Sequence, residues 1–503
     1  MMTQDLALRI LGAGQSALLT GPAGSGKTHV LREFIRRSRA AGKSVAVTAT
    51  TGLAATHLDG GTIHSWSGIG IHDELPSRFH ESLSESRQKT IRSADVLVID
   101  EISMLHDYRL DLVEQVARAV RADDRPFGGL QVVLCGDFFQ LPPVNRTGGR
   151  PGGFVVGSRA WQTLDPVVCY LNEQHRQDDQ EFLGILNALR AGTLDHDHVE
   201  LLRARHDAVL ADQRVTELYT TNVDVDRLNA QRLAAIQNAS EHRYAMQTSG
   251  KASYVESLKR ACLAHQELVL KVGALVMCIR NSQTGKYVNG SLGTVTGFDK
   301  ETGYPIVALR SGKTLLIEPE TWELRDGETK RASLTQIPLR LAWAITVHKS
   351  QGMTLDAARI DLGKAFVEGM GYVALSRVRS LETLSLVGLN RMALTVSAEA
   401  QVIDEQLRVA SAAAAERFAD LPEPEAPRPK TVEKTTWSDR LEVMREQYPN
   451  AYRPWNEGDD AQLKRLFQAG ATLKELTSKF GRHPGSIRSR LKKHFGEEVI
   501  IPR

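Results

Sequence analysis

The feature that most constrains the fold of this chain is the glycine-rich segment GPAGSGKT at residues 21–28. It fits the pattern G-x-x-x-x-G-K-[ST], in which glycines let successive backbone N–H groups face phosphate oxygens without an obstructing Cβ. Such a loop joins a β-strand to a helix whose positive N-terminal end faces the same anion, so we expect a strand over 17–20 and a helix from near Lys27. The residues expected to hold the phosphates are Gly21, Pro22, Ala23, Gly24, Ser25, Gly26, Lys27 and Thr28.

A second segment, VLVIDE at residues 96–101, supplies the carboxylates that such a loop works with. It is an apolar strand that ends in Asp100 and Glu101. Lys27 is expected to reach the β- and γ-phosphates, while the Thr28 hydroxyl and Asp100 bind Mg²⁺. Glu101 is placed to orient and deprotonate the attacking water. The two segments together predict hydrolysis of a nucleoside triphosphate with Mg²⁺.

The segment LCGDFFQLPPV at residues 134–144 is again a strand followed by polar residues. Gln140 in this segment can hydrogen-bond both the γ-phosphate and the attacking water, and so sense whether the phosphate is present. Two arginines are candidates to stabilise the transferred phosphoryl group, namely Arg176 in LNEQHRQ and Arg377 in YVALSRVRS. If both reach the γ-phosphate across a cleft between domains, hydrolysis and cleft closure become one event. The alternative is that each arginine pairs with a surface carboxylate.

Apolar β-branched runs alternate with longer helical patterns, which predicts an α/β protein with parallel sheets covered by helices. We expect the first α/β domain to span 1–165, with a polar insertion at 68–92, and the second domain to span 166–400. Short runs with Asn-Gly and Ser-Gly turns at about 260–335 predict a small β-barrel inserted in the second domain.

The composition is that of an ordinary soluble multidomain protein. The 503 residues are 42% apolar and 24% charged, and the net charge of +3 is too small to indicate a partner. We expect a cytoplasmic protein, because no apolar run approaches the ~18 residues of a membrane helix and the N-terminus lacks a basic leader. The four cysteines show no C-x-x-C or metal-ligand spacing, so we expect reduced core residues.

The order of these segments resembles that of superfamily 1 helicases, together with the strings VTATTGLAA, GTIHSW and LRLAWAITVHKSQGMTLD. The segment EISMLHDYRLDLVEQVARAVR at 101–121 resembles the signature of the petite integration frequency family of superfamily 1B, the 5′-to-3′ DNA helicases related to RecD. Matching strings span about 17–380. The resemblance implies two RecA-like motor domains, ATP as the nucleotide and Gln4 as the reader of adenine. It also implies a wedge at 68–92, an SH3-like barrel at about 260–335, and unwinding of DNA in replication, repair, recombination or telomere maintenance.

The resemblance makes single-stranded DNA the track, and three loops rich in hydrogen-bond donors are candidates to hold it. The residues expected to contact DNA are Thr50, Thr51, Thr62, His64, Trp66, His348, Lys349 and Ser350. Trp66 offers a ring on which a base could stack, although it and His64 could instead be packing residues. We expect a monomer that binds single-stranded and forked DNA with strong salt dependence, and the oligomeric state stays open.

The sequence changes character after Asn390. A helix and a proline-rich linker are expected at 401–436, and a separate module of three short helices at 437–503. Residues 464–495 hold nine basic side chains against one acidic residue, Glu475. This module resembles a helix-turn-helix or Myb-like domain that binds duplex DNA, and the alternative is a protein-docking or solubilising domain.

Two other functions stay open for the whole chain. One is a 3′-to-5′ or RNA-directed superfamily 1 helicase, which the signature at 101–121 and the HKSQG string at 348–352 argue against. The other is a DNA-bound regulator whose ATP site acts as a switch. The two candidate arginines and the three donor-rich loops argue against a regulator.

Overall fold

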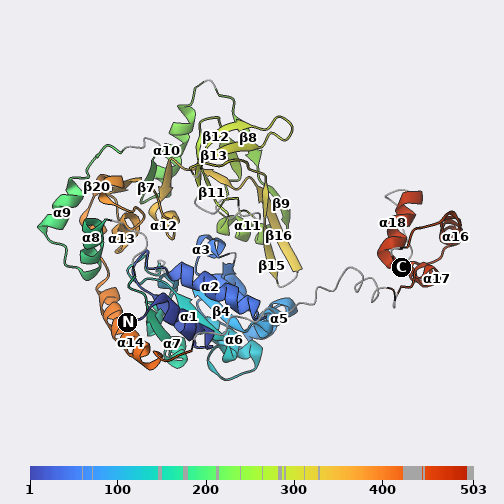
Figure 1. Cartoon of the computed structure of the whole chain (residues 1–503), viewed down its shortest axis with the longest axis horizontal. Helices are drawn as coiled ribbons and strands as arrows, with labels where there is room; N and C mark the ends of the chain where they lie inside the picture. The colour runs from blue at the N-terminus through green and yellow to red at the C-terminus, as the bar shows by residue number, and fades with distance from the viewer. Residues whose placement is uncertain are drawn as a thin grey trace. The chain divides into compact units, whose positions relative to one another are not determined.

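The computed structural model of the chain forms two compact units, residues 1–424 and 425–503, and each is described by itself (Figure 1). The structure describes all residues except 59, 71, 146–149, 174–178, 211–214, 238, 263, 281, 283–285, 288–290, 311, 327–328, 423–444, 446–447, 452 and 496–503. Most of the predicted linker therefore lies outside the described residues.

The first lobe of unit 1 is built on a six-stranded parallel sheet in the order β3-β2-β4-β5-β1-β6. Its strands are β1 (Ala17–Thr20), β2 (Val45–Ala49), β3 (Gly61–Thr62), β4 (Val96–Asp100), β5 (Gln131–Cys135) and β6 (Val167–Tyr170). The strands predicted around the phosphate loop and before the carboxylates are confirmed.

Helices cover both faces of this sheet, which is why its strands read as continuous apolar runs. Ala17 and Leu19 point to one face and pack with α1 (Gln4–Gly12) and α2 (Lys27–Ala40), whereas Leu18 points to the other. The helices and short helical turns of the second face are α4 (Ile63–Ser67), α5 (Glu85–Ser93), α6 (Asp107–Arg121) and α7 (Arg159–Leu164). The predicted polar insertion at 68–92 contains a 3₁₀ turn at Phe79–Ser82 and most of α5.

The prediction that the second domain begins at residue 166 is wrong, because β6 pairs in parallel with β1 of the first sheet. This edge strand is covered by α14 (Ala398–Arg417), which returns to the first lobe late in the chain. The Tyr170 backbone N–H donates to the Ser411 hydroxyl at 3.0 Å, and Ala414 and Ala415 join the core under α1 and α2. Helix α14 is thus part of the first lobe and not merely the start of a linker.

The second lobe holds a four-stranded parallel sheet in the order β18-β7-β19-β20. Its strands are β7 (Thr216–Tyr219), β18 (Ala344–Thr346), β19 (Ala358–Leu362) and β20 (Leu384–Leu389). Its helices, with those that lead into it, are α8 (Gln180–Ala191), α9 (His196–Arg203), α10 (Asn222–Ala234), α12 (Val347–Ser350) and α13 (Met370–Leu375). Strand β7 was not predicted, since its TELY sequence carries only one large aliphatic residue.

Between β7 and β18 the chain forms three antiparallel sheets with an apolar core of their own. Their strands are β8 (His242–Ala245), β9 (Gln247–Gly250), β10 (Glu267–Leu270), β11 (Leu275–Cys278), β12 (Leu292–Phe298), β13 (Pro305–Leu309), β14 (Thr314–Leu316), β15 (Glu320–Asp326), β16 (Thr329–Gln336) and β17 (Leu339–Leu341), with helix α11 (Ala252–Ala261) after β9. The insertion is confirmed, but the predicted range of about 260–335 is too narrow at both ends.

Unit 2 contains α16 (Glu457–Gln468), α17 (Leu473–Phe480) and α18 (Pro484–Phe495), close to the predicted helices. The core formed by these helices consists of Leu463, Leu476, Phe480, Ile487 and Leu491. All four cysteines are free, and three of them are buried. Within the described ranges, no helix is long and apolar enough to cross a membrane.

Candidate active site

The phosphate loop has the backbone that its glycines predict. Gly21, Gly24 and Gly26 have φ values of +136°, +89° and +87°, a region that favours residues without a Cβ. A Cβ at Gly26 would collide with the Gln4 amide, and one at Gly21 with the Leu171 carbonyl. Helix α2 begins at Lys27, so its N-terminal end faces the loop as expected.

Two side chains predicted to read the nucleotide lie against this loop. The Lys27 ammonium donates to the carbonyl oxygens of Gly21 at 2.7 Å and Pro22 at 2.8 Å, and burial lowers its pKa. The Gln4 amide donates to the Ser25 carbonyl at 3.4 Å. The structure therefore brings Gln4 next to the phosphate loop, a position compatible with the predicted contact to adenine.

The two carboxylates end strand β4 beneath the loop. The Asp100 carboxylate accepts the Glu101 backbone N–H at 2.9 Å. Burial raises the pKa of Asp100, and burial together with the Asp100 charge raises the pKa of Glu101 to about 7. A carboxyl that titrates near neutral pH is suited to act as a general base. Glu101 also has a positive φ of +53°, which turns the chain sharply at the end of the strand.

The oxygen atoms at this position suit a hard cation such as Mg²⁺, which prefers a few protein oxygens and keeps phosphate and water ligands. Asp100 and Thr28 both line the pocket beside the loop. Among the residues that the structure describes, no cluster of three or more His, Cys, Asp or Glu side chains forms an all-protein metal cage. The donor set therefore fits a metal ion that is shared with a triphosphate.

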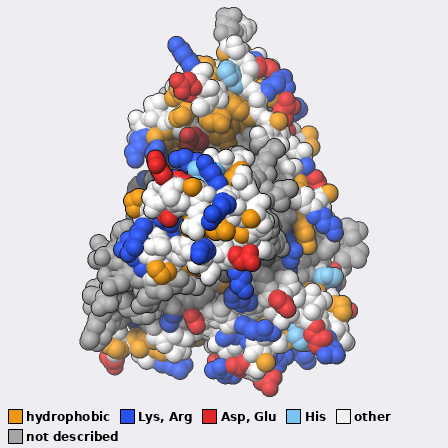
Figure 2. Space-filling model, turned by 90° about the vertical axis from the view of Figure 1, so that its right-hand side faces the viewer, with side chains coloured by type: hydrophobic (Ala, Val, Ile, Leu, Met, Phe, Trp, Pro, Cys, Tyr) orange, Lys and Arg blue, Asp and Glu red, His pale blue; other side chains and the backbone are white. Residues whose placement is uncertain are grey.

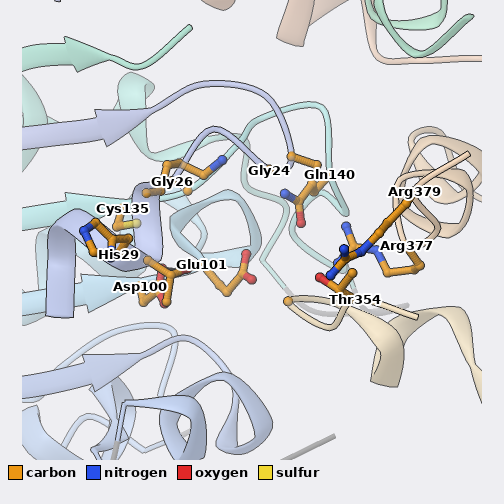
Figure 3. Close-up of a pocket in the computed structure, with 15 residues that line it drawn as sticks. Gly24, Gly26, His29, Asp100, Glu101, Cys135, Gln140, Thr354, Arg377 and Arg379 are labelled. Atoms are coloured by element: carbon orange, nitrogen blue, oxygen red, sulfur yellow. Dashed lines mark hydrogen bonds between the residues drawn. The ribbon is translucent and has the colours of Figure 1, made fainter. Parts of the chain in front are cut away.

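The pocket is closed from the opposite side by the second lobe. The Gln351 amide donates to the Glu101 carboxylate at 2.9 Å and to the Gln140 side-chain oxygen at 3.2 Å. Arg377 and Arg379 line the same pocket, and Figure 3 shows both approaching from the second lobe toward Gln140 and Glu101. Gln351 and Arg379 were not predicted to line the site. Gln351 follows the predicted Ser350 in HKSQG, and Arg379 lies two residues after the predicted Arg377 in SRVRS.

Arg377 is buried at 1% exposure, so the alternative of a surface ion pair does not apply to it. Its guanidinium donates to the Val373 carbonyl and to the Ser376 hydroxyl, each at 2.7 Å. It also donates to the carbonyls of Ser350 and Met353 at 3.4 and 3.2 Å. These bonds fix the side chain at the edge of the pocket. The second predicted arginine, Arg176, lies outside the described residues.

A buried polar cluster connects the two lobes next to the pocket. Asp137, two residues after β5, accepts two hydrogen bonds from Arg190 of α8 at 2.8 and 2.9 Å. Burial acts to raise the pKa of Asp137, but the charges of Arg190 and Lys27 outweigh it and hold that pKa below its usual value. Arg190 also donates to Asp404 of α14 at 3.1 Å.

Tyr372 of α13 is the member of this cluster that reaches the phosphate loop. Its hydroxyl donates to Asp137 at 3.2 Å and accepts the Arg190 guanidinium at 3.0 Å. It also accepts the backbone N–H of Ala23 at 2.9 Å. A phosphate-loop amide is therefore held by a residue of the second lobe, on the same helical segment that leads to Arg377.

The threonines predicted to bind DNA begin short helices or bond the residue that follows strand β4. Thr50 is buried, and its hydroxyl donates to the Glu101 carbonyl at 3.0 Å. Thr51 and Thr62 cap α3 (Gly52–His57) and α4 by accepting the N–H groups of Ala54 and Ser65, each at 3.2 Å. Thr51 and Thr62 thus mark the N-termini of two short helices, whereas Thr50 connects this region to Glu101.

His64 and Trp66 lie on α4 and are both partly buried. Burial, with the nearby charges of Arg109 and His106, lowers the pKa of His64 to about 4, so this histidine is neutral at physiological pH. Trp66 packs against the main apolar core, and its indole N–H is buried without a partner among the described residues. The alternative that His64 and Trp66 are packing residues is thus supported, because part of each side chain is buried.

The HKSQG segment forms the short helix α12 and its end. His348 stacks on Phe366 with 6.1 Å between ring centroids, and Phe366 is 61% exposed. Lys349 donates to the Asn222 side chain at 2.9 Å. Ser350 is fully buried and donates to the Val347 carbonyl at 2.8 Å, so the expected DNA contact by Ser350 conflicts with its position. Phe366 was not predicted, because a single phenylalanine in a loop carries no pattern.

Family models match two parts of the chain. The model of the PIF1-like helicase matches residues 7–200, and that of the 2B domain of the DNA helicase Pif1 matches residues 253–298. The second match falls within the antiparallel insertion.

Relatives and solved structures match most of the chain. An ATP-dependent DNA helicase Pif1 of a Psychrobacter species is 41% identical over 84% of this chain and 73% of its own length. The human ATP-dependent DNA helicase PIF1 is 38% identical over 78% of this chain, which spans 61% of that protein. The crystal structure of the Pif1 helicase from Candida albicans is similar with a TM-score of 0.70, 34% identity and coverage of 80% of this chain and 98% of that one. A Bacteroides Pif1 helicase in complex with ADP-AlF3 and single-stranded DNA is similar with a TM-score of 0.61, 32% identity and coverage of 81% and 97%.

Proposed function

Because this chain belongs to the PIF1-like helicase family, we propose that it is an ATP-dependent DNA helicase that moves 5′ to 3′ on single-stranded DNA and separates the strands of a fork. The observation that carries this proposal is the contact across the pocket, where Gln351 of the second lobe bonds Glu101 and Gln140 of the first. A nucleotide bound there touches both lobes. Nucleotide turnover can therefore move one lobe against the other.

In this proposal Glu101 is the general base. Its carboxylate takes a proton from the attacking water, and the pKa of about 7 gives a mixed protonation state at neutral pH before the nucleotide binds. Lys27 leaves the carbonyls of Gly21 and Pro22 to bind phosphate oxygens. Mg²⁺, held by Thr28 and Asp100 together with phosphate oxygens, supplies charge neutralisation when bound.

Gln140 and Gln351 are proposed to sense the γ-phosphate together. The Gln351 amide donates to both Gln140 and Glu101, so a phosphate that bonds Gln140 must rearrange this contact. Arg377 and Arg379 add positive charge from the second lobe, which stabilises the transferred phosphoryl group only when the lobes are close. Turnover is then greatest in a closed state, and release of the products permits opening.

The DNA track is proposed to run over the short helices α3, α4 and α12. The N-termini of α3 and α4 supply backbone N–H groups for phosphates, and Lys349 supplies a charge. The exposed ring of Phe366, supported by His348, offers a surface for base stacking. Gln351 lies two residues after Lys349 and bonds Glu101, so the proposed track and the proposed general base are connected through a few residues.

The finer architecture is also part of this proposal. Both lobes are RecA-like motor domains, the insertion at 68–92 is the wedge at the strand-separation point, and the antiparallel insertion contains an SH3-like barrel. Adenine is read by Gln4, whose amide lies beside the phosphate loop. The direction of movement rests on the family resemblance.

The proposal is tested with Glu101→Gln in an unwinding assay on forks that carry either a 5′ or a 3′ single-stranded tail. Loss of the base should lower ATP turnover by roughly 10²-fold or more while nucleotide binding persists. Only the 5′-tailed fork should be unwound by the wild-type protein. Unwinding by Glu101→Gln at the wild-type rate would refute the catalytic assignment. Equal ATPase stimulation by RNA and DNA oligonucleotides would favour the RNA-directed alternative.

A further inference from the structure

Exposed positive charge alone does not single out a binding surface on this protein. Lys and Arg side chains stand at many separate places on the coloured part of the face that Figure 2 draws. The C-terminal unit, formed by α16, α17 and α18 at the red end of the chain in Figure 1, differs in how its charges are arranged. The two solved relatives described above cover 80% and 81% of this chain, so about a fifth of it has no counterpart in them.

The connection between α17 and α18 has the length and the glycine that are typical of a helix-turn-helix. Only residues 481–483 separate Phe480 from Pro484, and Gly481 ends α17 with a φ of +55°. Turns of three or four residues that contain glycine are typical of this motif. A capping box at Thr472 and Glu475 fixes the start of α17, and the two helices pack through Leu476, Phe480, Ile487 and Leu491.

Two acidic side chains of α16 have partners within this unit. Asp460 of α16 forms ion pairs with Arg490 and with His494, and side-chain hydrogen bonding by Arg490 holds its pKa far below the usual value. Asp459 pairs with Arg482 at 3.3 Å. Two of the nine basic side chains at 464–495, Arg482 and Arg490, therefore form ion pairs within the fold.

Arg482 in the turn is the clearest case. It is 4% exposed, its guanidinium lies 4.2 Å from the centre of the Trp455 ring, and it donates to the carbonyls of Arg453 and Pro454. These contacts attach the turn to the segment that precedes α16. The position of α18 relative to the other two helices is thus fixed.

The outward face of α18 is basic and has no acidic side chain. Ile487 and Leu491 point into the core, while Arg488, Ser489, Lys492 and Lys493 are exposed on the other side of the helix. Arg488 and Lys492 are four residues apart and so lie one above the other. Gly485 and Ser486 at the start of the helix are small, which permits close approach of a large ligand.

We propose that the C-terminal unit binds duplex DNA by placing this face of α18 in the major groove. The 12 residues of α18 extend about 18 Å, and the major groove is wide enough to admit an α-helix. Arg488 and Lys492 contact the phosphates of the groove, and the N-terminal residues face the base edges, as the second helix of a helix-turn-helix does. This activity is additional to the motor, whose track is single-stranded DNA.

The test uses the full chain without nucleotide and a blunt-ended duplex oligonucleotide labelled for fluorescence anisotropy. The double variant Arg488→Ala/Lys492→Ala should bind the duplex roughly tenfold more weakly and lower the slope of log K against log salt by about 2. The matched control is Lys464→Ala/Arg465→Ala, which removes the same charges from the exposed face of α16. It should stay within about twofold of the wild type if α18 carries the contact.

Unchanged duplex affinity in Arg488→Ala/Lys492→Ala overturns the proposal, and so does an equal loss in both double variants. Strong binding by an RNA duplex and none by DNA would also overturn it. Both substituted pairs are exposed, so the ATPase activity stimulated by single-stranded DNA should be the same in the wild type and both variants. If the wild-type protein lacks that stimulation, the motor assignment fails while the duplex measurement still decides this proposal.

Discussion

Replacing Gln351 by alanine tests the proposed connection between the DNA-binding segment at 348–352 and the general base Glu101. The Gln351 amide donates to the Glu101 carboxylate at 2.9 Å, and this bond favours the charged form of Glu101. A hydrogen bond to a charged group contributes about 1.5–3 kcal/mol, and one pKa unit corresponds to about 1.4 kcal/mol. Because water can replace part of the bond in the variant, we expect the pKa of Glu101 to rise by about one unit.

The sign follows from the role of the group. In the proposed mechanism Glu101 acts as a base, so activity should be lost as pH falls through its raised pKa of about 7. With the pKa raised by one unit, the deprotonated fraction at pH 7 falls about fivefold. The assay is kcat/KM for ATP, stimulated by single-stranded DNA, measured across pH, because kcat/KM reports the pKa values of the free enzyme.

The matched control for this experiment is Lys349→Ala, two residues earlier. Lys349 contacts Asn222 and not Glu101, so its loss should weaken DNA binding and leave the acidic limb of the pH profile in place. The reasoning is refuted if Gln351→Ala leaves the acidic limb unshifted, or if Lys349→Ala shifts it by the same amount.

Two further changes probe the contact between the lobes and the track. Tyr372→Phe should destabilise unit 1 by about 1–3 kcal/mol, because it leaves the buried N–H of Ala23 without its partner, and thermal unfolding would detect this as a lower midpoint. Tyr219→Phe, which loses one bond to Glu217, is the control, and an equal loss of stability in both would contradict the special role of Tyr372. On the track, Phe366→Ala should weaken binding of single-stranded DNA by about 1–3 kcal/mol if a base stacks there. Ser350→Ala should leave that binding unchanged, since the Ser350 hydroxyl is buried. Both affinities are measured by titration with a labelled oligonucleotide. A larger loss of affinity in Ser350→Ala than in Phe366→Ala would contradict the assignment.

The phosphate loop and the carboxylates could be predicted because their function depends on local backbone conformation. Glycines at Gly21, Gly24 and Gly26 are required where φ is positive, and an apolar run before Asp100 specifies a buried strand. The same reasoning located the three helices of the C-terminal unit, whose stops at Gly470 and Gly481 also have positive φ. In these cases the residues that determine the local structure lie within a few positions of the loop, strand or helix end that they determine.

The errors concern contacts between residues far apart in the chain. Strand β6 joins the first sheet because it pairs with β1 and is covered by α14, and nothing within its own four residues distinguishes one parallel sheet from the other. The partner of Asp137 could not be predicted for a similar reason, since Arg190 comes from α8. Gln351 was missed for the same reason, because its partners Glu101 and Gln140 belong to the first lobe.

The central claim is that a nucleotide draws the two lobes together and that bound DNA takes part in this movement. It is tested most directly by energy transfer between dyes at exposed positions of the two lobes, Arg39 on α2 and Glu382 before β20, in a protein in which the partly exposed Cys262 is replaced by serine. The account predicts a shorter distance when ADP with aluminium fluoride binds, and a different distance when single-stranded DNA is added. A distance that is the same with and without nucleotide, in the presence of DNA, would contradict it.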